Sequence, residues 1–320
     1  MSRPPLRYLK TETDLARELG IAIPHPIRLF DLEGIGIDRA QFLGDLAPSF
    51  RRLRWDTNDV IREQVAFLLR KFPEHADRLV DFRQRYTRDA TDLRELTDLF
   101  RLLDHAAKRK FELIRSYRRR SIAQFVLTKE DTAIWQDEWR VQQTHCHGFR
   151  QHVHPDDVRS EERIFDPTAD DVIRHSEFQA LLVSVAVMVE EAEATAGRTT
   201  DAMTLTFHQM SLLVYDGALP TNAPEGVHRD GADYIVSALV IEREDVEGGE
   251  SHVLSPTRDR PYLTITLQPG QGLFQADMHH ALPPEQQLWH DVTPIRLRDT
   301  NGDGEGYRNI FGFDIAIARR

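Results

Sequence analysis

The sequence predicts an α+β chain in which helices come first and strands follow. Residues 1–200 are rich in Arg, Glu, Leu and Ala with helical periodicity, whereas residues 201–320 carry short β-forming runs broken by Gly and Pro. The chain shows no internal repeat and no low-complexity tract. We therefore expect a mainly helical region over 1–160 and a β-rich domain over 161–320.

Composition is typical of a folded globular protein, with 40% hydrophobic and 29% charged residues. No apolar run approaches the ~20 residues needed to cross a bilayer, and the N-terminus lacks the apolar core of a signal peptide. The net charge of −11 would repel nucleic acids. The single cysteine, Cys146, excludes an intramolecular disulfide and fits a reducing compartment. We expect a cytoplasmic protein that binds neither membranes nor nucleic acids.

Helical periodicity in the first half begins at Thr57 and runs to Phe72, where Pro73 ends it. A second helical stretch is expected over 74–118, with a break near 87–89. The basic run Arg115–Arg120 at its end is interpreted as a solvated helix face, with a role in binding an acidic partner as the alternative.

The clearest helix is expected between Asp170 and Ala196, with a capping arrangement at Thr168 and a stop at Gly197. Its apolar positions form one helical stripe: Phe178, Leu181, Leu182, Val185, Met188, Val189 and Ala192. Such a stripe needs an apolar partner, and the sheet that follows is the natural one.

The second half predicts seven or eight short strands separated by turn signals. We expect them near 203–215, 234–242, 250–255, 261–268, 271–277, 289–297 and 307–317. Many short strands at this spacing indicate a sandwich or barrel rather than a βαβ sheet. The predicted architecture is a double-stranded β-helix, or jelly roll, backed by helices.

The segment PEGVHRDG carries the first candidate metal ligands, His228 and Asp230. Side chains two residues apart on an extended strand point to one face. One imidazole and one carboxylate make two thirds of the facial triad that binds Fe(II) and leaves positions open for a cosubstrate and O2. Gly226 and Gly231 flank the pair and allow close approach of backbone and ligands.

Three later histidines could complete this triad. His290 lies in LWHDVTPI, an apolar–His–apolar run typical of a strand with an inward ligand, and we favour it. His280 is the competitor, and His279 is the weakest of the three. Both lie in MHHALPPEQQ, which runs directly into a Pro-Pro turn.

A 2-oxoglutarate cosubstrate would need a cation for its distal carboxylate, and the planar guanidinium of arginine makes two parallel hydrogen bonds to such a group. Arg308 opens the last predicted strand, which we expect to run beside the strand of His290. Arg296 and Arg298 are nearer in sequence but are interpreted as surface arginines.

Together these residues resemble the 2-oxoglutarate/Fe(II) dioxygenase family that includes bacterial L-isoleucine 4-hydroxylase. Four blocks occur in the family's order over roughly residues 160–320. They are His208-Gln209 before an apolar strand, PEGVHRDGADYIV, the turn at 248–251, and WHDVTPI with the later Arg308.

The resemblance implies a jelly-roll core, Fe(II) bound by His228, Asp230 and His290, and Arg308 as the 2-oxoglutarate ligand. It implies hydroxylation of an unactivated C–H bond of a free amino acid or derivative, with O2 consumed and succinate and CO2 released. Related halogenases replace the triad carboxylate by a small residue, so Asp230 implies hydroxylation, with desaturation as the alternative, rather than halogenation.

Departures from the family bear on the substrate more than on the reaction. ALPPEQQL before Trp289 resembles an insertion, DTNGDGEG lengthens the path to Arg308, and extra helical material lies around 75–140. The alternative is therefore the same chemistry on a peptide, protein or carrier-bound amino acid. A cupin-like metal-binding protein without redox chemistry is a third reading, and a homodimer through the helical side is a further expectation.

Other potential ligands are given simpler interpretations. His208, on the first strand of the barrel, is expected to be a buried, hydrogen-bonded structural histidine. The segment from Thr144 to His154 is dense in histidine, but its spacing differs from that of four-ligand zinc sites. We interpret its residues as surface or pocket residues, with an accessory metal site as the alternative.

Overall fold

The computed structural model describes residues 5–86, 92–130, 138–146, 148–151, 163–215, 218–298 and 304–318. Its largest element is a seven-stranded antiparallel sheet in the order β1-β9-β5-β12-β4-β2-β3. These strands span Ile27–Asp31 (β1), Arg118–Glu130 (β2), Glu138–Thr144 (β3), Ala202–Val214 (β4), Tyr234–Glu244 (β5), Gln271–Ala276 (β9) and Gly306–Ile317 (β12).

Two smaller sheets complete the β structure. One has the order β10-β7-β8, with β7 at Ser251–Leu254, β8 at Pro261–Ile265 and β10 at Trp289–Val292. The other pairs β6 (Val246–Gly248) with β11 (Ile295–Leu297). This mixed architecture of helices and antiparallel sheets fits a jelly-roll core, and most of the strands predicted from the sequence are present.

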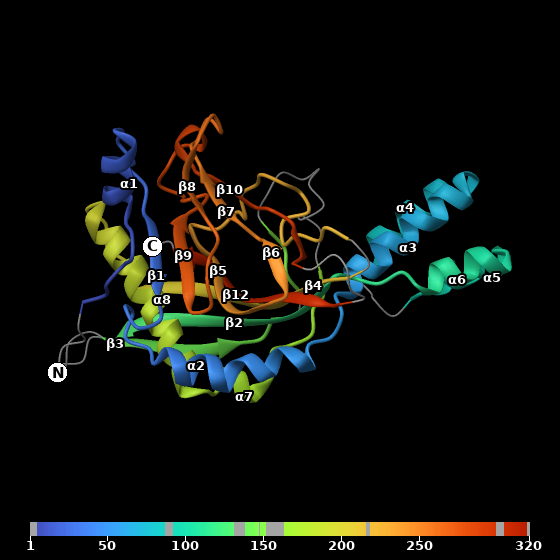
Figure 1. Cartoon of the computed structure of the whole chain (residues 1–320), viewed down its shortest axis with the longest axis horizontal. Helices are drawn as coiled ribbons and strands as arrows, with labels where there is room; N and C mark the ends of the chain where they lie inside the picture. The colour runs from blue at the N-terminus through green and yellow to red at the C-terminus, as the bar shows by residue number, and fades with distance from the viewer. Residues whose placement is uncertain are drawn as a thin grey trace.

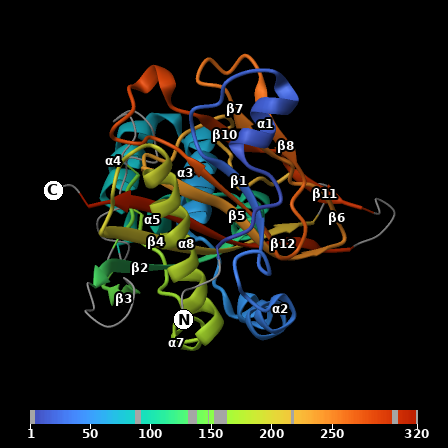
Figure 2. The ribbon, with the colours of Figure 1, turned by 90° about the vertical axis from the view of Figure 1, so that its left-hand side faces the viewer.

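The two faces of the large sheet are covered differently. Helix α8 (Ser176–Thr195) and helix α2 (Arg39–Leu46) pack on one face, where they share a core with Phe207, Phe311 and Phe313. The β10-β7-β8 sheet and helix α1 (Glu12–Leu19) cover the other face, in a second core. Figure 2 shows α8 running along the sheet. The expectation that the apolar stripe of this helix rests on the sheet is confirmed.

Alternation along β12 explains these two faces. Phe311, Phe313 and Ile315 join the core under the helices, whereas Ile310 belongs to the core under the small sheet. Side chains of successive strand residues point to opposite faces. Arg308 shares the face of Ile310, so β12 places its arginine between the sheets.

A helical arm extends away from the sheets (Figure 1). It consists of α3 (Thr57–Lys71), α4 (Ala76–Tyr86), α5 (Arg94–Leu102) and α6 (His105–Glu112). The arm has its own apolar core, which includes Leu68, Leu79, Phe82 and Leu99. The expected helix ending before Pro73 is confirmed, and the expected break near 87–89 lies outside the described residues.

The helical character expected for the first half is present in part. Strands β1, β2 and β3 belong to this half, yet they join the large sheet. The interpretation of Arg115–Arg120 as a solvated helix face was wrong, because β2 begins at Arg118. Arg118 and Arg120 are buried on one face of this strand, since residues two apart on a strand share a face.

The expected helix between Asp170 and Ala196 is present as α7 (Asp170–Ile173) followed by α8, and Gly197 follows with φ of 72°. The cap expected at Thr168 was wrong. Ala169 precedes α7 and makes no side-chain cap, while the Thr168 hydroxyl lies 3.1 Å from that of Ser121. None of the described helices combines the length and apolar character that a membrane crossing requires.

Candidate active site

His228, Asp230 and His290 come together between the large sheet and the β10-β7-β8 sheet. One potential ligand atom from each lies within 4.8 Å of the others. Asp230 Oδ2 is 3.2 Å from His290 Nε2, and Asp230 Oδ1 is 3.4 Å from His228 Nε2. Two imidazole nitrogens and one carboxylate facing a common point are the donor set of the Fe(II) facial triad. The residues present therefore fit this metal.

The backbone holds the two histidines in register. His228 and His290 form an isolated antiparallel bridge with N–H···O distances of 2.9 and 3.0 Å. His228 Nδ1–H donates to the carbonyl of Gly226 at 2.7 Å, which leaves Nε2 to face Asp230. The expectation that His228 and Asp230 lie on one extended strand was wrong. They lie in a loop, because glycines with φ of 75° (Gly226) and 87° (Gly231) turn the chain here.

Two nearby carboxylates, those of Asp230 and Glu225, affect the pKa of His228. Burial alone would lower it, but the carboxylates of Asp230 and Glu225 raise the pKa to about 9. Burial likewise opposes the charge of Asp230, but the two histidines hold its pKa well below the usual range. The carboxylates thus stabilise a proton on His228, and a metal cation bound at Nε2 would take the place of that proton.

Asp277 supports the site and was not identified from the sequence. Its Oδ2 accepts the N–H groups of Asp230, Gly231 and Ala232 at 3.0, 2.8 and 3.2 Å. Its Oδ1 lies 3.7 Å from His290 Nδ1, and neither atom has a hydrogen-bond partner among the described residues. A metal-bound histidine usually directs its second nitrogen at such a carboxylate, so this arrangement orients Nε2 towards the metal position.

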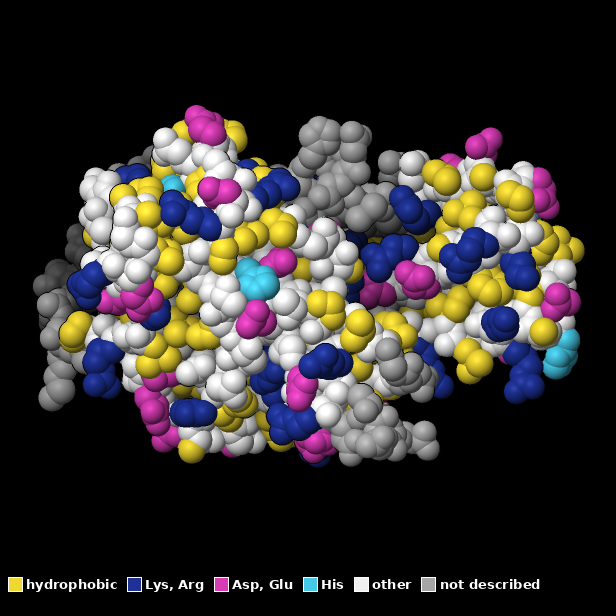
Figure 3. All heavy atoms as spheres, turned by 45° about the horizontal axis from the view of Figure 1, so that its top comes forward, with side chains coloured by type: hydrophobic (Ala, Val, Ile, Leu, Met, Phe, Trp, Pro, Cys, Tyr) yellow, Lys and Arg dark blue, Asp and Glu magenta, His cyan; other side chains and the backbone are white. Residues whose placement is uncertain are grey.

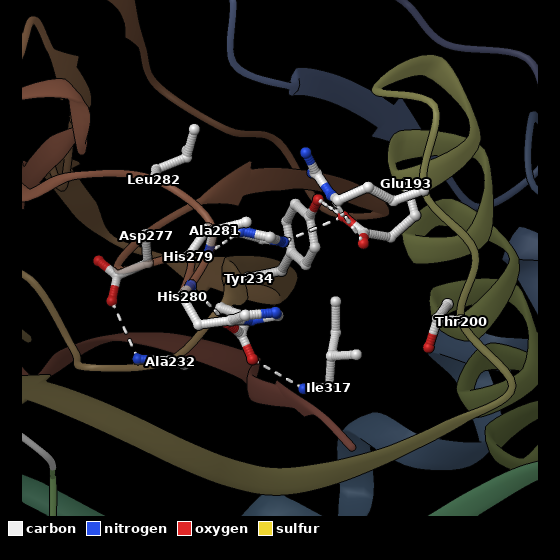
Figure 4. Close-up of polar contacts among 12 residues, drawn as sticks. Glu193, Thr200, Ala232, Tyr234, Asp277, His279, His280, Ala281, Leu282 and Ile317 are labelled. Carbon is white, nitrogen blue, oxygen red and sulfur yellow. Dashed lines mark hydrogen bonds and ion pairs between the residues drawn. The ribbon is translucent and has the colours of Figure 1, made fainter. Parts of the chain in front are cut away.

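His279 and His280 occupy a different place. His279 Nε2–H donates to Glu193 at 3.0 Å while Nδ1 accepts the N–H of Ala281 at 3.1 Å. His280 Nδ1 bonds Asp233 at 2.7 Å. In Figure 4 the His279 ring points towards Glu193 beside Tyr234. These contacts account for the two histidines, and the structure brings His290, rather than either of them, next to His228 and Asp230.

A cavity of about 470 Å³ opens beside these three side chains. Its wall is built from the large sheet, the β10-β7-β8 sheet, the loop that carries His228 and the base of the helical arm. Arg308 lines it and is only 1% exposed. The guanidinium donates from one terminal nitrogen to Asn222 at 2.9 Å, while Nε and the other terminal nitrogen have no partner among the described residues.

Arg308 is therefore a buried cation with free donors. Burial, with a smaller contribution from Arg243, lowers its pKa to about 9. A carboxylate would satisfy both unpaired nitrogens with parallel hydrogen bonds, so the residue fits a 2-oxoglutarate carboxylate. The expectation that its strand runs beside that of His290 was wrong. Strand β12 lies between β4 and β5 in the large sheet, and the two residues approach the cavity from facing sheets.

His208 and Arg296 both lie in the environments predicted from the sequence. His208 is buried as expected, accepts from Arg120 at Nδ1 and bonds Asp314 through Nε2. Burial, helped by Arg120 and Arg163, holds its pKa well below the usual range, so the ring is neutral. Arg296 is exposed, as expected, and pairs with Glu247.

Gln151 lies in the histidine-rich segment and lines the cavity, where its amide donates to Asp230 at 2.6 Å. His147, His152 and His154 of that segment lie outside the described residues. Gln151 therefore agrees with the interpretation of this segment as surface or pocket residues. Arg120 and Arg163 were not identified as site residues, because they converge from segments far apart in the sequence.

Comparison with known proteins supports this chemistry. The model of the 2OG-Fe dioxygenase family matches residues 103–314, more than half of the chain. No curated protein matches the sequence. A bsmA homologue from Methylobium petroleophilum PM1 is similar in structure, with 22% identity, a TM-score of 0.49, and 62% of this chain and 71% of that one covered.

IDO from Bacillus thuringiensis is also similar, with 13% identity, a TM-score of 0.44, and 69% of this chain and 80% of that one covered. The family assignment rests on the match over 103–314. The chain belongs to the 2OG-Fe dioxygenase family, whose members use Fe(II) and 2-oxoglutarate, and is thus an oxidoreductase of the EC 1.14.11 type.

Proposed function

We propose that this dioxygenase hydroxylates an unactivated C–H bond of a free amino acid or amino-acid derivative and releases succinate and CO2. His228, Asp230 and His290 hold Fe(II) in this proposal, and Arg308 holds 2-oxoglutarate. The observation that supports it most is one cavity lined both by the three clustered ligands and by a buried arginine with free donors.

Other residues of the cavity would orient the metal ligands, bind 2-oxoglutarate and contact the substrate. When bound, Fe(II) and 2-oxoglutarate together supply the activation of O2 for attack on a C–H bond. Asp277 faces Nδ1 of the His290 ring at 3.7 Å, and Gln151 donates to one oxygen of Asp230. Arg308 neutralises a carboxylate that burial would otherwise disfavour. Met210 and Ile310 provide an apolar wall for the substrate.

The size of the cavity favours a small molecule. At about 470 Å³ it lies within the range of ~300–1,000 Å³ that is usual for small-molecule pockets. A free amino acid with 2-oxoglutarate fits this space, whereas a folded protein would reach it only through one extended side chain.

A tethered substrate is a second candidate because the helical arm forms part of the cavity wall. Arg62, Glu63 and Tyr86 of α3 and α4 line it. The arm also exposes Leu102 and Leu113, which are 65% and 63% accessible. On the face shown in Figure 3, basic, acidic and hydrophobic side chains alternate over this end of the molecule. Such a mixed surface could receive a peptide or carrier protein.

The two candidates are separated by turnover measurements. Purified protein with Fe(II), 2-oxoglutarate and each of the common L-amino acids should form succinate and a product heavier by one oxygen for at least one of them. An Asp230→Ala variant should form neither, and His280→Ala serves as its matched control. Activity on peptidyl or carrier-bound amino acids alone would favour the second candidate.

A further inference from the structure

Two further arginines, Arg120 and Arg163, line the same cavity. They lie at its far end from Arg308. Arg120 on β2 is aligned with Met210 on β4, and Met210 is aligned with Ile310 on β12. Arg120 and Arg308 thus stand on strands separated by β4 and are offset by two residues along the strands, which places their backbones about 12 Å apart. Arg163 enters the same cavity from the segment before α7. The cavity has a second cationic region that the cosubstrate arginine does not account for.

Neither guanidinium forms an ion pair with an acid among the described residues; Asp56 and Asp314 act on both only through longer-range attraction. Arg120 is 8% exposed, and within the described part of the chain its side chain donates to the neutral His208 at 3.0 Å. Arg163 donates from its side chain to the amide oxygen of Gln151 at 2.9 Å. Nε of each is buried without a partner among the described residues. Burial, with Arg163 as the next cause, lowers the pKa of Arg120 to about 10.

Arg118, on the same face of β2, differs from Arg120 because an acid neutralises its charge directly. It forms a two-pronged ion pair with Asp59, at 2.7 and 2.5 Å. Asp314 lies in the cavity near Arg120, yet its carboxylate accepts from His208 instead. Arg120 is a buried cation and Arg163 a partly buried one, and the acids that offset their charge form no direct ion pair with them among the described residues. An anion bound by both guanidinium groups would therefore stabilise them.

The two guanidinium groups are also held in place before any ligand arrives. Arg120 lies over the ring of Phe165 at 4.4 Å, and Arg163 over that of Phe149 at 5.2 Å. His208, fixed by Asp314, sets the direction of Arg120. Preorganised arginines lose little side-chain entropy on binding and match the planar geometry of a carboxylate.

This region adjoins the metal-binding residues. Gln151 donates to Asp230 through its amide nitrogen and accepts from Arg163 through its oxygen. An anionic group bound by the two arginines would therefore be separated from Asp230, a proposed iron ligand, only by the side chain of Gln151. We propose that Arg120 and Arg163 bind the carboxylate of the substrate and so orient its carbon chain towards the metal. This assignment rests on the proposed function.

The test measures binding rather than turnover. The protein is saturated anaerobically with Fe(II) and 2-oxoglutarate, and its visible band confirms that the cosubstrate site is filled. L-amino acids and their carboxamides are then titrated by calorimetry. Acids should bind the wild type more tightly than the matching amides. Arg120→Gln and Arg163→Gln should weaken acid binding roughly 10- to 100-fold and leave amide binding unchanged.

Arg119→Gln is the matched control, because this neighbouring residue stacks on Trp55 at 4.3 Å and does not line the cavity. It should leave the affinity for acids unchanged, and thermal melting verifies that every variant folds. Equal binding of acids and amides, an equal loss in Arg119→Gln, or no acid that binds in an Arg120-dependent way would overturn the inference. Absence of the visible band in the wild type would instead mark failure of the proposed function.

Discussion

Asp277 is placed to orient His290 in the metal-bound state. Its carboxylate faces His290 Nδ1 and gathers three backbone N–H groups of the loop that carries Asp230. Asp277→Asn keeps an oxygen for the N–H groups but loses the charge that faces the imidazole. We expect metal affinity to fall about 10- to 100-fold, measured by anaerobic Fe(II) titration. The exposed Asp259→Asn is the control, and an unchanged affinity in Asp277→Asn would contradict this role.

Arg308 gives a second prediction for a single residue. Arg308→Gln removes the charge that would meet the distal carboxylate, and we expect the KM for 2-oxoglutarate to rise roughly 10- to 100-fold. Arg308→Lys should recover part of this loss, since it restores the charge without the planar fork. Arg296→Gln, on the exposed surface, should match the wild type. Steady-state kinetics with varied 2-oxoglutarate measures all three, and equal KM values would remove Arg308 from the cosubstrate site.

Residue patterns predicted part of the site and could not predict the rest. The spacing of His228 and Asp230 is local, so it can be read directly, even though the backbone there proved to be a loop. Asp277, Arg120 and Arg163 lie in the site only through contacts between distant segments. No local pattern distinguishes such residues from ordinary polar residues before the fold brings them together.

Strand β2 is the element that links the helical arm to the cavity. Arg118, which opens this strand, pairs with Asp59 of α3, and both side chains are about 90% buried. Burial opposes the charge of Asp59, but Arg118 holds its pKa below the usual range. Replacing Asp59 by Asn leaves a buried arginine without its acid.

We expect Asp59→Asn to lower the free energy of unfolding by about 3–5 kcal/mol, as is usual when one partner of a buried ion pair is removed. Denaturant titration followed by circular dichroism measures this loss. Asp98→Asn, in the exposed pair with Arg78, is the control and should cost under about 1 kcal/mol. Equal and small losses in both variants would show that the arm is not anchored through Arg118.

At the level of elements, the strands of the second half were predictable because alternation and turn residues are local signals. Strand β2 was not, since its run of arginines resembles a polar helix face. The arginines lie instead in a sheet, where every second one faces the cavity. Charge composition alone does not distinguish a solvated helix from a strand that lines a polar site.

The helical and β layers of the molecule are joined through Glu193. This residue of α8 is buried and accepts hydrogen bonds from Arg198, from Tyr234 on β5 and from His279 after β9. Burial opposes its charge, but the bonds from these partners hold its pKa far below the usual value. A depressed folded-state pKa stabilises the protein above the unfolded pKa of about 4.3. That stabilisation is lost as the pH falls further.

The melting temperature should therefore fall as the pH drops below about 4.5, and Glu193→Gln should flatten this decline while lowering stability at pH 7. Glu190→Gln is the control, since Glu190 lies on the same helix but is partly exposed and pairs with Lys129. Thermal melts between pH 3 and 7 provide the comparison. A decline in Glu193→Gln as steep as that of the wild type would contradict the assignment.

The central claim is that His290, with His228 and Asp230, holds Fe(II) where it can bind 2-oxoglutarate. Anaerobic addition of Fe(II) and 2-oxoglutarate, followed by visible spectroscopy, tests it most directly. Wild type and His280→Ala should both develop the weak charge-transfer band of bound cosubstrate. Asp230→Ala and His290→Ala should not. A band that survives in His290→Ala and disappears in His280→Ala would contradict the account.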